Sequence, residues 1–208
     1  MFRLMAGFRR FREKYFETDS VYTRLSSTGQ TPKTLLIGCS DSRVDPAIMT
    51  DASPGELFVI RNVANLVPPC EPSRSGFHGT SSAIEFAVEN LKVENVIILG
   101  HRQCGGIRAL MQGGTGSDDT FIHQWMKIAG EAKKKVLAEN PKADEDTKLR
   151  LAEMESIKVS YKNLLSFPFV QDAIKSRAMN VIGLYFDLEQ GSIQEYHFTE
   201  DDFLPLEI

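Results

Sequence analysis

The stretch T-L-L-I-G-C-S-D-S-R, residues 34–43, places a short apolar run directly before a cysteine, an aspartate and an arginine. A second stretch of the same design lies at residues 95–106, N-V-I-I-L-G-H-R-Q-C-G-G. Both apolar runs are short and partly β-branched, which is typical of buried parallel strands. Ligands of open parallel sheets bind beyond the carboxyl ends of the strands. We therefore expect the polar residues of both stretches to meet at one sheet edge.

Strands and helical segments alternate around these two stretches. Residues 57–61 form another short apolar run, and residues 180–187 return to this pattern late in the chain. Residues 80–91 carry apolar side chains on one broad helical face. The alternation predicts an α/β fold, with a mostly parallel central β-sheet flanked by helices. A turn at residues 189–192 leads into residues 193–198, which we predict to form an antiparallel C-terminal edge strand.

Helical patterns extend this core into a single domain over residues 1–208. The first 28 residues predict an extended N-terminal helical arm, in which basic residues alternate with an apolar stripe made of Leu4, Phe8, Phe11 and Tyr15. We expect the stripe to pack on the domain or on another subunit. A basic amphipathic helix also fits a membrane surface or an organelle transit signal. Charged helical segments at residues 118–139 and 144–165 predict a helical elaboration over about 117–166.

Composition narrows the class of protein. The chain has 208 residues, 42% of them hydrophobic, which is enough for a sizeable core. A net charge of -4 gives no general attraction to nucleic acid. The three cysteines are an odd number with no secretory signal before them, so we expect a reducing, cytoplasmic location. The apolar runs are too short to cross a bilayer, and we expect no membrane partner.

Two cysteines and a histidine occupy the ends of the predicted strands: Cys39, His101 and Cys104. Thiolates and imidazole are zinc ligands, and three protein ligands leave the fourth tetrahedral position open, as in catalytic zinc sites. The alternative is three unrelated buried residues, because free cysteine often fills a core. The strand-end position of all three residues favours the metal site.

Asp41 and Arg43 follow Cys39 at the period-two spacing that puts alternate side chains on one side of an extended segment. Arginine can hold a carboxylate bidentately and favour its ionised form. Asp41 would then accept a hydrogen bond from metal-bound water, or would itself bind the metal as a fourth ligand and close the site. An Asp and an Arg two residues apart are often only a surface pair, and the adjoining Cys39 decides against that interpretation.

The order of C-S-D-S-R and H-R-Q-C resembles the β-class carbonic anhydrases. The resemblance covers nearly the whole chain and continues through residues 54–68, 79–88, 163–170 and 183–191. It implies that Cys39, His101 and Cys104 bind one Zn²⁺ per subunit and that Asp41 and Arg43 form a catalytic dyad.

The resemblance also implies substrate-binding residues. Gln30 matches a glutamine that, in the plant-type branch, reaches a neighbouring active site. Phe58 matches an aromatic residue of the pocket, and Phe86 stands where that branch commonly has tyrosine. Another branch binds bicarbonate at a regulatory site whose positions here are Leu36, Arg61 and Phe86. Two of these three depart from that set, so we do not expect this regulation. The family further implies a homodimer or a larger homo-oligomer.

The implied function is the zinc-dependent, reversible hydration of carbon dioxide to bicarbonate and a proton, by attack of zinc-bound hydroxide. Two alternatives keep the zinc. One is a hydrolase of carbonyl sulfide or carbon disulfide. The other is a non-catalytic, zinc-stabilised regulatory module in which Asp41 permanently closes the coordination shell. The family match leaves Cys70 outside the ligand set.

Overall fold

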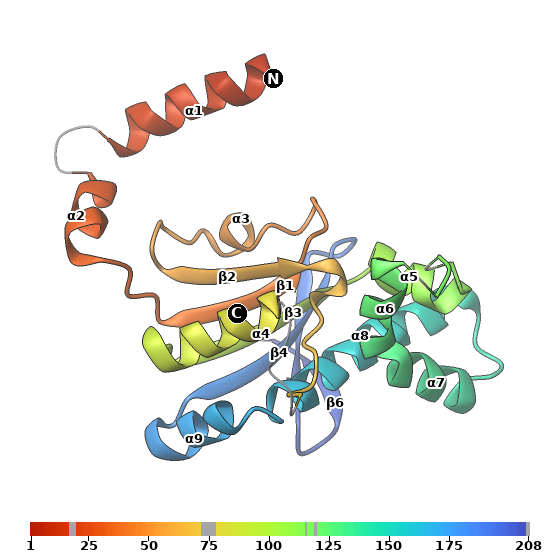
Figure 1. Cartoon of the computed structure of the whole chain (residues 1–208). Helices are drawn as coiled ribbons and strands as arrows, with labels where there is room; N and C mark the ends of the chain where they lie inside the picture. The colour runs from red at the N-terminus through yellow and green to blue at the C-terminus, as the bar shows by residue number, and fades with distance from the viewer. Residues whose placement is uncertain (17–19, 72–77, 115, 119, 207–208) are drawn as a thin grey trace.

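A six-stranded sheet forms the centre of the computed structural model, which describes all residues except 17–19, 72–77, 115, 119 and 207–208 (Figure 1). The strand order is β2-β1-β3-β4-β5-β6, in which the first four strands are parallel and the last two antiparallel. The strands are β1 Thr34–Cys39, β2 Leu57–Asn62, β3 Asn95–His101, β4 Asn180–Asp187, β5 Ser192–His197 and β6 Asp202–Pro205. The predicted α/β fold with a mostly parallel sheet is confirmed.

Helices surround this sheet, and two helices precede it at the N-terminal end of the chain. They are α1 Phe2–Tyr15, α2 Val21–Thr28, α3 Pro46–Thr50, α4 Gly79–Glu85, α5 Gly105–Gln112, α6 Phe121–Met126, α7 Gly130–Glu139, α8 Glu145–Leu164 and α9 Pro168–Arg177. Short 3-10 turns lie at Val63–Asn65 and Lys127–Ala129, and a π-helical segment, Phe86–Asn90, continues α4. In the described part of the chain, no helix has the length and apolar character needed to span a membrane.

The N-terminal helix is present as predicted, but its apolar stripe does not pack on the sheet. Helix α1 projects away from the body of the molecule, and none of its described residues is buried (Figure 1). Phe11 and Tyr15 instead contact Tyr22 of α2, with ring centroids 5.4 and 6.0 Å apart. Within one chain, Phe11 and Tyr15 therefore pack on α2 and not on the sheet, and packing of the stripe on another subunit stays a prediction.

Two predicted segments differ from the structure. The predicted helix over 118–139 is divided into α6, a 3-10 turn and α7, with Gly130 at the start of α7. The predicted edge strand at 193–198 is β5, but β6 pairs with its outer side. The chain reverses at Asp201, which has φ +52°. Phe203 is then buried in the core, with its ring centroid 5.4 Å from that of Tyr196. Phe203 is the buried residue of β6, and residues after 198 were not predicted to form a strand.

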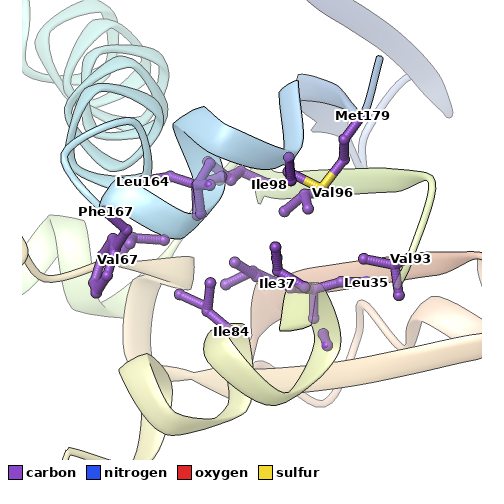
Figure 2. Packing of buried hydrophobic residues seen from close by; sticks show 14 of the residues in the cluster. Leu35, Ile37, Val67, Ile84, Val93, Val96, Ile98, Leu164, Phe167 and Met179 are labelled. Atoms are coloured by element: carbon purple, nitrogen blue, oxygen red, sulfur yellow. The ribbon is translucent and has the colours of Figure 1, made fainter. Parts of the chain in front are cut away.

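The main core lies between the sheet and helices α4, α8 and α9 (Figure 2). Its residues include Leu35 and Ile37 of β1, Val96 and Ile98 of β3, and Leu164 of α8. The second cluster of buried residues gathers at the carboxyl end of β1, under α5, α6, α7 and α8. Two cysteines of the predicted metal site belong to this second cluster, so they lie in an apolar, water-poor part of the molecule.

Helix α8 lies close to β3 at Gly100, the residue before His101. A Cβ atom added to Gly100 would lie 2.6 Å from Cδ1 and 2.7 Å from Cγ1 of Ile157. Packed cores cannot absorb such an overlap without moving a side chain or the backbone. Glycine at this position is therefore what lets α8 lie against the end of β3.

We expect Gly100→Ala to lower the free energy of unfolding by about 1–3 kcal/mol, the usual cost of overpacking. Urea denaturation followed by circular dichroism measures this change. Gly130→Ala is the matched control, because an added Cβ there meets none of the described atoms within 4 Å and the backbone is helical. We expect this control to gain about 0.4–1 kcal/mol. Equal stability of the two variants would contradict the close approach of α8.

Candidate metal centre

Parallel pairing of β1 with β3 brings the two sequence motifs together. Gly38 is level with Leu99, so Cys39 and His101 both project from the carboxyl edge of the sheet. Cys104 follows at the start of α5, after a short turn. The two cysteine Sγ atoms are 4.0 Å apart, and all three ligand atoms lie within 4.8 Å of one another. Tetrahedral zinc with sulfur bonds of 2.3 Å would separate two sulfurs by about 3.8 Å.

His101 presents the nitrogen that a metal requires. Its Nδ1 lies 2.8 Å from the backbone oxygen of Arg102 and donates to it, since a carbonyl oxygen only accepts. This contact leaves a lone pair on Nε2. Nε2 is buried and has no hydrogen-bond partner in the described part of the chain. An orphaned buried nitrogen beside two thiols fits a zinc ligand whose ring is oriented by a backbone carbonyl.

The two thiols influence each other strongly. The hydrogen bond from the Cys104 thiol lowers the pKa of Cys39, and the backbone N–H of Asp41, 3.4 Å from the Cys39 Sγ, acts in the same direction. The same contact raises the pKa of Cys104, because a second thiolate would lie 4.0 Å from the first. A bound dication removes this repulsion and favours two thiolates.

Arg43 holds the Asp41 carboxylate at the rim of this donor set. Its Nε and Nη2 donate to Oδ1 and Oδ2 of Asp41, at 3.0 and 2.7 Å. These hydrogen bonds hold the pKa of Asp41 well below its usual range. Asp41 Oδ2 lies 4.0 Å from His101 Nε2. Arg43 also donates to the carbonyl oxygen of Gln103, at 3.0 Å, so it joins the two motifs.

Comparison with known proteins identifies the family of this chain. Residues 34–193 match a family model described as carbonic anhydrase. The chain is 38% identical over 192 residues to "Beta carbonic anhydrase 6, mitochondrial" of Arabidopsis thaliana. The chain belongs to the β-class carbonic anhydrases. The match covers 91% of this chain and 65% of the Arabidopsis protein, so the chain spans less than two thirds of that relative.

Solved β-class carbonic anhydrases share the fold over nearly its whole length. The β-carbonic anhydrase CcaA matches with a TM-score of 0.89 and 30% identity, over 99% of this chain and 92% of that chain. One of two tetrameric β-carbonic anhydrases from Sordaria macrospora matches with a TM-score of 0.80 and 29% identity, over 93% and 94% of the two chains. These matches agree with the α/β architecture and the N-terminal helix.

The structure does not bring the family's substrate-binding positions to this chain's own donor set. Phe58 lies level with Leu35, four residues before Cys39, or about 13 Å away along the strand. Its ring contacts that of Phe86, with centroids 5.9 Å apart, and Phe86 is 42% exposed. Gln30 is exposed after α2. Within one chain, Phe58 and its neighbour Phe86 therefore lie away from the donor set.

Arg61 holds the loop that carries Asp41. Its Nε donates to the backbone oxygen of Cys39 at 2.9 Å, and its Nη2 to the backbone oxygen of Asp41 at 2.7 Å. Its Nη1 donates to Asp45 Oδ2 at 2.9 Å. Leu36, another position of the bicarbonate set, is buried. The Arg61 side chain thus holds the loop of the candidate metal centre.

Glu153 of α8 was not identified from the sequence, although its carboxylate accepts a hydrogen bond from the backbone N–H of Cys104. Burial raises the pKa of Glu153 to about 7. Its two hydrogen-bond donors, the backbone N–H of Cys104 and the hydroxyl of Tyr185, lie in other elements, so no short sequence motif identifies Glu153. A signal was present, because Glu153 shares one face of α8 with the apolar residues Leu149, Ala152, Ile157 and Leu164. An acid on an apolar helical face indicates a buried polar contact.

We expect Cys104→Ser to reduce bound zinc from about one ion per chain to less than about a tenth, because one of three protein ligands is lost. Elemental analysis of dialysed protein measures the zinc content. Cys70→Ser is the matched control, since Cys70 is outside the group of described residues that could hold a metal. Full zinc content in Cys104→Ser would show that the metal lies elsewhere.

Proposed function

We propose that this protein catalyses the zinc-dependent, reversible hydration of carbon dioxide to bicarbonate and a proton. The observation that carries the proposal is the Cys39, His101 and Cys104 donor set with an ionised Asp41 held beside it by Arg43. Zinc bound by these ligands would lower the pKa of a coordinated water from 15.7 to about 7. The family to which the chain belongs supports this assignment.

Asp41 is the group that orients the reacting water. The Arg43 hydrogen bonds keep it ionised at neutral pH, so it accepts hydrogen bonds and does not donate them. Arg43 occupies both carboxylate oxygens, which favours Asp41 remaining at the rim over its binding the metal as a fourth ligand. Buried apolar residues around the two cysteines, among them Val44, Ala64 and Leu66, exclude bulk water. A small apolar molecule such as carbon dioxide fits these surroundings.

The remaining assignments concern a second copy of the chain. We propose that Gln30, Phe58 and Phe86 contribute to the substrate pocket of a partner subunit in a homodimer or larger oligomer. The Phe58 and Phe86 rings already form an apolar surface in one chain. The matched Sordaria macrospora protein is described as tetrameric, which supports assembly. A cytoplasmic location stays a prediction, which imaging of a fluorescent fusion would test.

We expect Asp41→Asn to lower kcat/KM for carbon dioxide hydration by about 10- to 100-fold, the usual effect of removing a hydrogen-bond partner of a metal ligand, here the coordinated water. Stopped-flow assays with a pH indicator measure the rate, and elemental analysis should show unchanged zinc. Asp172→Asn, an exposed change on α9, is the control and should keep the wild-type rate.

Two results would contradict the proposal. Wild-type protein with full zinc and no hydration rate above buffer would exclude carbonic anhydrase activity, and hydrogen sulfide release from carbonyl sulfide would then identify the alternative hydrolase. Wild-type activity in Asp41→Asn would remove Asp41 from the reaction. A zinc-stabilised module without catalysis predicts that Asp41→Asn changes stability alone.

A mixing experiment tests whether Gln30 acts in the partner's site. Gln30→Ala and Asp41→Asn homodimers should each have low activity. In a symmetric dimer, refolding an equal mixture yields hybrids in which one site combines an intact Asp41 with an intact Gln30. We expect about a quarter of wild-type activity to return, because about half of the dimers are hybrids with one intact site. No recovery would place Gln30 in its own subunit's site, and wild-type activity of the Gln30→Ala homodimer would place it outside any site.

A further inference from the structure

Glu153 is a buried acid that the proposed reaction does not use. It lies in the middle of α8, and 2% of its surface is exposed. Burying a carboxyl group is unfavourable unless hydrogen bonds replace its contacts with water. Oε1 accepts from the backbone N–H of Cys104 at 2.9 Å, and Oε2 accepts from the hydroxyl of Tyr185 at 2.9 Å. Glu153 therefore links the backbone of a metal ligand to the buried part of β4.

The Cys104 N–H requires this acceptor because of its place in the chain. Cys104 precedes the first turn of α5 with extended backbone angles, φ −65° and ψ 119°, so its N–H lies outside the hydrogen bonds of the helix. The preceding residue, Gln103, has φ +58°, a left-handed conformation that is unfavourable for a residue other than glycine. The Glu153 contact holds this turn in place and keeps the Cys104 Sγ 4.0 Å from that of Cys39.

Tyr185 fixes Glu153 in turn. The Tyr185 side chain is completely buried on β4, and its hydroxyl occupies Oε2, so Oε1 stays directed at the Cys104 N–H. The three residues come from β4, α8 and the turn before α5, which are far apart in sequence. These hydrogen bonds therefore depend on the tertiary fold, and they connect the turn before Cys104 to the central sheet.

We propose that Glu153 is a positioning residue of the metal centre, which orients the Cys104 thiolate through the Cys104 backbone N–H. The inference rests on the proposed zinc site. Hydrogen-bond partners behind metal ligands typically change metal affinity or activity 10- to 100-fold when they are replaced. A purely structural role would lower stability and leave the zinc affinity of the folded protein unchanged.

The test compares zinc affinity in the full-length protein, measured by competition with a chromophoric chelator at a temperature where each variant is folded. Glu153→Met keeps the volume but has no acceptor, and we expect it to bind zinc about 10- to 100-fold more weakly, with a changed absorption spectrum of the cobalt(II) form. Glu153→Gln keeps an oxygen for the Cys104 N–H, and we expect its affinity within about threefold of wild type. The control Leu164→Ala, at the far end of α8, should be less stable and bind zinc within about twofold.

Each outcome has a definite meaning. Glu153→Met with wild-type zinc affinity and a wild-type cobalt spectrum would overturn this inference and leave the proposed function intact. Affinity in Glu153→Gln as low as in Glu153→Met would also overturn it, since the acceptor is retained there. Wild-type protein that binds no zinc would overturn both. Should Glu153→Met not fold, Tyr185→Phe decides: we expect about three- to tenfold weaker zinc binding, and wild-type affinity would contradict the role.

Discussion

The parallel pairing of β1 with β3 is the constraint on which the site depends. It ends both strands at one edge of the sheet and so delivers Cys39 and His101 to the same place, although 61 positions separate them in the chain. Gly100 then allows α8 to lie against β3, and α8 carries the acid that supports the third ligand. Shifting the register by one residue would turn every side chain of a strand to the opposite face, and the donor set would not form.

Arginine side chains arrange the charges around this donor set. Arg43 keeps Asp41 ionised and joins the Asp41 loop to the turn between His101 and Cys104. Arg61 holds the same loop from β2 through two backbone oxygens and a carboxylate. Guanidinium groups suit this task because their donors lie in a fixed plane and remain charged. The loop that carries Asp41 is therefore held by hydrogen bonds from two arginine side chains.

The strands and the pairing of Asp41 with Arg43 could be predicted from the sequence, because short local patterns indicate both. The apolar runs before Cys39 and His101 marked the strands, and the period-two spacing of Asp41 and Arg43 marked their pairing. Glu153 could not be predicted in the same way, since its partners come from distant elements and its helix looked like an ordinary charged one. The reversal that adds β6 was also missed, because a single buried residue, Phe203, holds that strand in place.

X-ray absorption at the zinc edge, on wild-type protein and Asp41→Asn, would show which atoms bind the metal. We expect two sulfur ligands at about 2.3 Å, one nitrogen at about 2.0–2.1 Å and one further light atom, with the same spectrum in both proteins because Arg43 holds Asp41 away from the metal. A light-atom ligand that disappears in Asp41→Asn, or a coordination shell without two sulfurs, would contradict this expectation.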